Sequence, residues 1–312
     1  MYLLSSASED GIFLFSEKNI RKGIAVKKNI LVLTLLILIV FVTGCDSKKQ
    51  ETAGPLPERI ISLSPGNTEI AFAIGLGEKI VGVTDYCNYP EEALGKQKIG
   101  GFANPNLEAI IALEPDLVLA GNKHTEIAKK LEEMGIEVLI LVPTSLEEVY
   151  ASMELVAAAA GNEENTAKVI AGMKGRMQKV QEKLSAIPQD KRVRVYYEVF
   201  SNPLMSAGGV SLVNEVLTLA GGKNIFTDIS EGYPKISNEA IIERDPQFIL
   251  FPQKHGSEES NVDSFAVRPV WEKITAVKNK RIFGVQGDAI SRPGPRLIDA
   301  VEEVAMLLYP DL

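Results

Sequence analysis

Two short segments of the sequence repeat each other, and each begins with a glutamate. The tetrapeptide EAII starts at Glu108 and again at Glu239, and a proline follows at the same distance in both copies, as Pro115 and Pro246. An apolar run that reads as a strand comes directly after each proline. Agreement of helix, proline and strand at one offset predicts that the two segments occupy equivalent places in two related halves of the chain.

The residues before each glutamate are good helix caps. Asn106 and Ser237 precede the two segments and place Glu108 and Glu239 in a first helical turn, where the helix dipole favours a carboxylate. We expect the apolar residues beside them to face inward, namely Leu107, Ile110, Ile111, Ile241 and Ile242. The glutamates then point to solvent as ordinary first-turn residues, or they bind arginines of a two-fold symmetric partner, which presents the same site twice.

Histidine and cysteine are the other candidates for chemistry. The only histidines, His124 and His255, follow the two equivalent strands, and each comes directly after a lysine. Histidine is an axial ligand of haem and a common metal ligand, although histidines on surface loops are more often neither. Cys45 lies just after an apolar run, and Cys87 has no cysteine partner if Cys45 is modified.

Several classes of function are excluded by what the sequence lacks. It has no nucleophile elbow, no His/Cys cluster with zinc spacing and no P-loop, and Gly75-Leu76-Gly77 lacks the last glycine of a dinucleotide fingerprint. The net charge of −8 argues against binding to nucleic acid. We therefore expect a binding protein that is not an enzyme and holds no resident cofactor.

The N-terminal region reads as an export signal. The apolar run from Ile30 to Val42 follows two lysines, ends at Thr43-Gly44 and is too short to span a bilayer. Cys45 then completes a bacterial lipobox, which predicts a lipid anchor on the outer face of the cytoplasmic membrane. We expect a signal peptide over 1–44, with translation starting at Val26 because mixed charges before it are atypical, and a lipidated tether over 45–57.

The rest of the chain predicts two α/β lobes. Continuous Val/Ile/Leu runs alternate with helical stretches over 58–145 and again over 189–312, which indicates mostly parallel sheets covered on both faces. Residues 146–188 are helix-forming with an interruption near Gly161-Asn162. The fold class is thus two Rossmann-like lobes joined by a long rigid helix, a connection that allows only a small hinge motion.

Several motifs resemble one known family. They are LSPGNTE at 63–69, DYCNYP at 85–90, NLE at 106–108, GGKNIF at 221–226, YPKIS at 233–237 and SRPGPR at 291–296. These stretches resemble the cobalamin-binding proteins of ATP-driven importers. That group belongs to the helical-backbone class of substrate-binding proteins, which also binds haem and ferric siderophores. The resemblance covers nearly all of the chain after Cys45.

The resemblance implies a corrinoid such as cobalamin between the lobes and a two-fold symmetric ABC permease, with its ATPase, as the partner. The implied ligand-binding residues are Ser64, Pro65, Asn67, Tyr86, Phe102, Tyr233 and Asp288. Glu108 and Glu239 match the pair that docks on the permease. The sequence alone supports this placement in part, since ligands of open α/β sheets lie beyond the carboxyl ends of strands and flat macrocycles favour aromatic walls.

The sequence also departs from the family pattern. Phe102 stands where these proteins can have tryptophan, and Gly121-Asn122 lacks an aromatic residue at another wall position. Phe102 or Tyr233 can equally be loop aromatics packed on their own lobe. The alternatives are therefore a haem or ferric-siderophore binding protein, with His124 and His255 as metal ligands only in the haem case, or a surface lipoprotein that senses its ligand.

Overall fold

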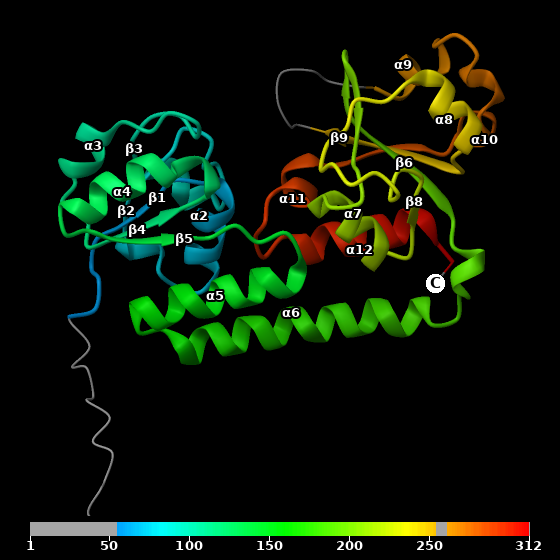
Figure 1. The fold of residues 1–312 in the computed structure, drawn as a ribbon. Helices are drawn as coiled ribbons and strands as arrows, with labels where there is room; N and C mark the ends of the chain where they lie inside the picture. Colours follow the sequence, from blue (N-terminus) through cyan, green and yellow to red (C-terminus); the bar gives the residue numbers. More distant parts are fainter. Residues whose placement is uncertain (1–54, 254–260, 312) are drawn as a thin grey trace, which may run out of the picture. The chain divides into compact units, whose positions relative to one another are not determined.

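The computed structural model describes residues 55–253 and 261–311, and the first of two α/β lobes begins the described chain (Figure 1). Its five-stranded sheet has the order β3-β2-β1-β4-β5, with all neighbouring strands parallel. The strands are β1 (Ile60–Ser62), β2 (Ile80–Val83), β3 (Gln97–Lys98), β4 (Leu117–Ala120) and β5 (Glu137–Ile140). The helical segments are α2 (Pro65–Ala73), α3 (Leu107–Ile111) and α4 (Thr125–Glu133), with 3-10 turns η1 (Gly77–Lys79), η2 (Glu91–Gly95) and η3 (Asn122–His124).

The second lobe has its own five-stranded sheet. Four of its strands follow the order β10-β9-β6-β7, and the fifth strand, β8, also pairs with β6. The β6–β7 pair is antiparallel, and the other pairs are parallel. The strands are β6 (Arg194–Ser201), β7 (Leu204–Ser206), β8 (Lys223–Asn224), β9 (Phe248–Gln253) and β10 (Ile282–Gln286). The helices are α7 (Leu212–Leu219), α8 (Asn238–Arg244), α9 (Val262–Ala266), α10 (Thr275–Lys278), α11 (Gly287–Ser291) and α12 (Leu297–Leu308), with 3-10 turns η4 (Gln189–Lys191) and η5 (Trp271–Lys273).

The repeat seen in the sequence is confirmed in the two sheets. β1 lies between β2 and β4 in the first lobe, as β6 lies between β8 and β9 in the second. A residue with positive φ follows each of α3 and α8, Glu114 and Asp245, just before the matching strands β4 and β9. Arg59 and Arg194 donate to the backbone carbonyls at these two helix ends, so the lobes share the same local construction.

Two helices, α5 (Leu146–Ala160) and α6 (Glu163–Leu184), connect the lobes and lie side by side (Figure 1). Gly161 ends α5 at φ 67°, a left-handed conformation that glycine adopts without strain. The amides of Asn162 and Asn165 donate to the carbonyl of Ile74 in the first lobe. Arg176 on α6 binds two carboxylates of α12 in the second lobe, so the connection is packed against both lobes.

One apolar cluster runs through the first sheet, the α5–α6 pair and the second sheet. It includes Ile60 and Leu117 of the first lobe, Met153 of α5, and Val195 and Val301 of the second lobe, all nearly inaccessible to solvent. Close-packed interiors transmit strain and resist deformation. This packing is consistent with the small hinge motion expected from the sequence, which stays a prediction.

The predictions for residues 1–54 and for His255 lie outside the described residues. They comprise the signal peptide, the start at Val26, the lipidated Cys45 and most of the tether. Within the described part of the chain, no helix is both long and apolar enough to cross a membrane.

Candidate functional site

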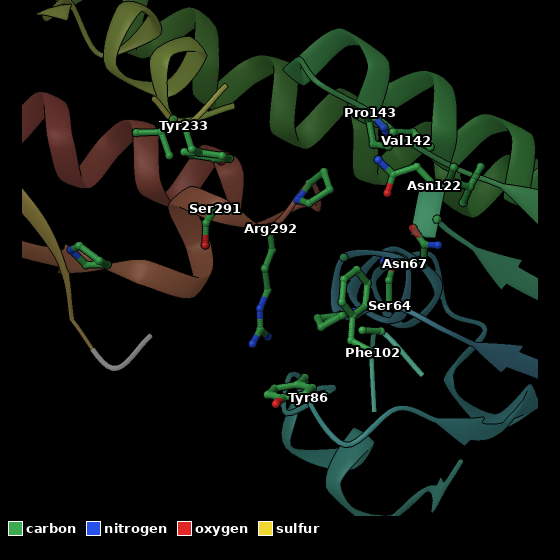
Figure 2. Close-up of a pocket in the computed structure, with 18 of the residues that line it drawn as sticks. Ser64, Asn67, Tyr86, Phe102, Asn122, Val142, Pro143, Tyr233, Ser291 and Arg292 are labelled. Carbon is green, nitrogen blue, oxygen red and sulfur yellow. Dashed lines mark hydrogen bonds between the residues drawn. The ribbon is translucent and has the colours of Figure 1, made fainter. Parts of the chain in front are cut away.

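A cavity of about 630 Å³ is lined by residues of both lobes (Figure 2). This volume lies within the range of about 300–1,000 Å³ that is usual for small-molecule sites. Six of the seven ligand-binding residues expected from the sequence line the cavity, and Asp288 does not. The full lining consists of Ser64, Pro65, Gly66, Asn67, Tyr86, Phe102, Ala103, Gly121, Asn122, Leu141, Val142, Pro143, Tyr197, Val199, Val213, Tyr233, Pro252, Ser291, Arg292 and Pro293.

The β1–α2 turn forms the first part of the wall. Ser64 caps α2 by accepting a hydrogen bond from the backbone N–H of Asn67, and Pro65 occupies the first helical position, where its missing N–H costs nothing. The buried amide of Asn67 donates to the carbonyl of Ala120 at the end of β4, over 2.9 Å. The turn is thus tied to the carboxyl ends of two neighbouring strands, where ligands of such sheets bind.

Aromatic side chains face the cavity from both lobes. Tyr86 and Phe102 come from the first lobe, while Tyr233 comes from the second (Figure 2). Tyr197 of the second lobe also lines the cavity. Tyr86 is 63% exposed and Tyr233 is 43% exposed, so both have free surface for a ligand. Burial of the phenol raises the pKa of Tyr233 above its ordinary value, which keeps the hydroxyl protonated and able to donate.

His124 supports this wall from behind. Its Nδ1 accepts the backbone N–H of Gly121 over 2.9 Å, so the ring's proton resides on Nε2 and is donated to the carbonyl of Phe102 over 2.7 Å. The imidazole is buried and packs edge-on against the Phe102 ring, with ring centres 5.2 Å apart. Both nitrogens are therefore engaged, and this arrangement does not favour His124 as an axial metal ligand, the role considered for it in the haem case.

Asp288 has a different place from the one expected. Its carboxylate binds the guanidinium of Arg292 over 2.9 Å and accepts a hydrogen bond from the amide of Asn88. The side chain that reaches the cavity is Arg292, which extends toward Tyr86 (Figure 2). Asp288 does not line the cavity, because its carboxylate is bound to Arg292 and Asn88, and its contact with a ligand stays a prediction.

Several lining residues were not expected from the sequence. Ser291, Arg292 and Pro293 belong to the SRPGPR motif, which matches the family but carries no predicted role in the site. Val142 and Pro143 lie two and three residues after the end of β5, so the rule that placed Ser64 and Tyr86 would have found them too.

The cavity wall carries almost no net charge. Among the described lining residues, Arg292 alone carries a charge at neutral pH, and Asp288 neutralises it. Aliphatic and aromatic side chains dominate the remainder, with a few hydroxyls and amides at the edges. Such a wall suits an uncharged or internally neutral ligand with polar groups at its rim, because burying an unpaired charge is costly.

The repeated glutamates lie outside the cavity. Glu108 and Glu239 are exposed in the first turns of α3 and α8, which Asn106 and Ser237 cap as expected by accepting backbone N–H groups. Bonds from its own backbone N–H and from Ser237 lower the pKa of Glu239. The prediction for the apolar neighbours holds for the buried Ile110 and Ile241, and Leu107 and Ile242 are partly buried. It is wrong for Ile111, which is 37% exposed.

Metal binding by the protein alone finds no support in the described residues, which contain no group of three or more His, Cys, Asp or Glu side chains able to hold an ion. Cys87 is buried, with its sulfur 3.1 Å from the hydroxyls of both Thr68 and Thr84. It behaves as a small core residue.

Two α/β lobes, a helical connection and an inter-lobe cavity together define a two-lobed solute-binding protein. Residues 60–289 match the family model described as periplasmic binding protein, and the chain belongs to this family. The resemblance found in the sequence is therefore confirmed at the level of the class.

The matches to relatives cover most of this chain and most of theirs. The chain is 37% identical over 277 residues to the ABC transporter substrate-binding lipoprotein YvrC of Bacillus subtilis, covering 86% of each chain. It is 32% identical over 261 residues to a vitamin B12-binding protein of Vibrio cholerae, covering 82% of this chain and 91% of that one.

Solved structures agree with the fold. The periplasmic vitamin B12 binding protein BtuF of Vibrio cholerae superimposes with a TM-score of 0.70 at 30% identity, covering 81% of this chain and 97% of that one. The haem-binding protein RhuT from Roseiflexus sp. RS-1 gives a TM-score of 0.73 at 25% identity, with 81% and 98% covered. Because the fold resembles both a vitamin B12-binding and a haem-binding protein, these structures do not identify the ligand of this protein.

Proposed function

We propose that this protein is the substrate-binding lipoprotein of an ATP-driven importer, and that it captures a corrinoid such as cobalamin between its lobes for delivery to a permease. The proposal draws on the vitamin B12-binding relatives and on the aromatic cavity. Ser64, Pro65, Asn67, Tyr86, Phe102 and Tyr233 contact the ligand. The protein has no catalytic role of its own.

The nearly neutral wall of the cavity is the observation that favours a corrinoid. Haem carries two propionate carboxylates, and many ferric siderophores carry net negative charge, whereas the rim of a corrin bears uncharged amides. Arg292 is already neutralised by Asp288. An anionic ligand thus finds no free cation among the described lining residues and leaves a buried charge poorly paired, while amides can bond to Asn67, Asn122 or Ser291.

Haem is the second candidate, supported by the fold likeness to RhuT. An axial ligand is required for it in addition to a flat cavity. The geometry of His124 disfavours this role, so haem binding in this protein depends on a tyrosine of the cavity wall, such as Tyr86 or Tyr233, on His255, or on an open coordination position.

The two exposed glutamates supply the docking contacts in this proposal. Glu108 and Glu239 lie at equivalent positions of the two lobes, and arginines repeated by the two-fold symmetry of a permease can bind both at once. Cys45 carries the lipid that holds the protein on the outer face of the cytoplasmic membrane, where two or more acyl chains give stable anchoring. A surface sensor shares these features except for the permease.

Titration of the purified protein with cyanocobalamin and, separately, with haem tests the proposal. We expect cyanocobalamin to bind. Phe102→Ala or Tyr233→Ala should lower its binding affinity about tenfold, which corresponds to the loss of about 1.4 kcal/mol of aromatic contact. Phe200→Ala is the matched control, because Phe200 is similarly accessible (38% exposed) but does not line the cavity. Binding of haem with no binding of cyanocobalamin would overturn the corrinoid assignment.

A further inference from the structure

A buried ion pair joins the two lobes beside the cavity. Glu69 on α2 of the first lobe is only 2% exposed. Arg296, just before α12 of the second lobe, binds both of its carboxylate oxygens, with Nε 2.8 Å from Oε2 and Nη2 2.6 Å from Oε1. The guanidinium also lies over the ring of Tyr89, 4.0 Å from its centre. The pair is thus bidentate, stacked and shielded from water, the geometry in which arginine–carboxylate contacts are strongest.

The backbones of the two lobes touch at the same place. A Cβ atom at Gly66 would lie 2.7 Å from the carbonyl oxygen of Pro293, closer than real side chains approach. A Cβ atom at Gly294 would lie 3.3 Å from Oε2 of Glu69. The backbone contact at Gly66 has no space for a side chain, so α2 and the segment before α12 are in direct contact there.

The pair is coupled to the cavity without lining it. Gly66 and Asn67 line the cavity and precede Glu69 on α2, while Arg292 and Pro293 line it and precede Arg296. Arg292 extends the link, because its Nη1 donates to Oδ1 of Asn88 in the first lobe over 2.6 Å. Any change in the distance between Glu69 and Arg296 therefore moves the two facing walls of the cavity relative to each other.

We propose that Glu69 and Arg296 are positioning residues that set the spacing of the two lobes and, through it, the width of the ligand cavity. Burying two charges is expensive, so such a pair contributes little net stability compared with apolar residues of the same size. Its directional geometry instead selects one arrangement of the lobes among those that apolar contacts alone allow. The inference goes beyond the proposed function and rests on it only where ligand affinity is measured.

The protein contains a matched control. Glu198 on β6 is 1% exposed and binds both terminal nitrogens of Arg268, whose guanidinium lies over the rings of Phe265 and Trp271. This pair is also a buried arginine–carboxylate contact with aromatic stacking, but both partners belong to the second lobe. The further contacts differ, because Glu69 also lies 3.5 Å from Nη1 of Arg292 whereas Glu198 accepts a hydrogen bond from Tyr196. Breaking it disturbs the fold to a comparable degree without touching the contact between the lobes.

The experiment compares Glu69→Gln and Arg296→Lys with Glu198→Gln in the full chain. Hydrogen exchange without ligand reports opening directly. In Glu69→Gln we expect backbone amides to exchange about tenfold faster in α2, in α11 (Gly287–Ser291) and in the segment that follows α11. We also expect the affinity for cyanocobalamin to be at least about tenfold lower. Arg296→Lys keeps the charge but loses the bidentate geometry, so it should show a smaller change in the same direction. Glu198→Gln should lower thermal stability while exchange in α2 and cyanocobalamin affinity stay at the original values.

The two readouts separate failure of this inference from failure of the proposed function. If the unmodified protein does not bind cyanocobalamin, the corrinoid assignment fails, and the exchange of α2 and α11 alone decides the role of Glu69. Unchanged exchange at both segments in Glu69→Gln and in Arg296→Lys overturns the inference. It is also overturned if Glu198→Gln reduces cyanocobalamin affinity as much as Glu69→Gln does, because the effect would then be general destabilisation. Should Glu69→Gln not fold, Arg296→Lys provides the same two readouts.

Discussion

Replacing His124 by leucine separates a supporting role for this residue from a role as a metal ligand. Leucine is similar in volume but leaves the buried N–H of Gly121 without its acceptor and the carbonyl of Phe102 without its donor. Leaving a buried donor such as the Gly121 N–H unsatisfied destabilises the fold by about 1–3 kcal/mol. Loss of the hydrogen bond to the carbonyl of Phe102, a partly accessible residue, costs only about 0.5–1.5 kcal/mol, because water can replace the lost donor. We expect the free energy of unfolding to fall by about 2–4 kcal/mol.

Urea denaturation followed by circular dichroism measures this change as a shift of the midpoint at constant slope. Lys123→Ala is the control, because Lys123 is exposed on the same turn and should change the free energy of unfolding by less than about 0.5 kcal/mol. His124→Gln should recover part of the loss, since its amide oxygen can accept a hydrogen bond. A change below about 0.5 kcal/mol in His124→Leu, together with loss of a haem spectrum, would refute the supporting role and make His124 a ligand.

The remaining predictions concern docking, anchoring and pH. The double variant Glu108→Ala, Glu239→Ala removes both exposed carboxylates and should leave cyanocobalamin affinity unchanged. It should weaken permease pull-down by far more than tenfold, since truncating one partner of a buried charged contact costs about 2–5 kcal/mol. Lost ligand affinity with intact pull-down would contradict the docking role of these glutamates. Cys45→Ala should release the protein from the membrane fraction in a cell-fractionation assay, and unchanged retention would refute the lipid anchor. Burial raises the pKa of Glu303, so the folded state holds its proton to higher pH than the unfolded state and stability falls as pH rises from about 4.5. Glu303→Gln, which keeps an acceptor for the N–H of Gln286, should therefore raise the melting temperature at pH 7 and have little effect at pH 4; equal shifts at both pH values would contradict this.

The elements of the fold could be predicted because each depends on residues close together in the chain. The apolar runs at β1, β4 and β9 are continuous since both faces of these parallel strands are buried. The caps Asn106 and Ser237 lie three residues before the N–H groups that they accept, so their role is visible in the sequence.

The position of single side chains at the site was less predictable. Ser64, Tyr86 and Phe102 follow strands and reach the cavity, but Asp288 follows a strand as well and binds Arg292 instead. Ile111 fits the apolar face of a helix in the sequence, yet α3 is only five residues long and its end is exposed. Strand ends indicate which edge of a sheet binds a ligand, whereas the rotamer of each residue depends on its neighbours in space.

Apolar periodicity, capping residues and motifs are local properties of the chain, so the two lobes, their internal repeat, the helical connection and the family could be predicted without a structure. The structure was needed to show that Glu69 binds Arg296, 227 residues away, and that Arg292, and not Asp288, lines the cavity. It was also needed to show that both nitrogens of His124 are engaged. These contacts depend on how the lobes and loops pack together, since a hydrogen bond or ion pair between distant residues requires a separation of about 3 Å that no local pattern encodes.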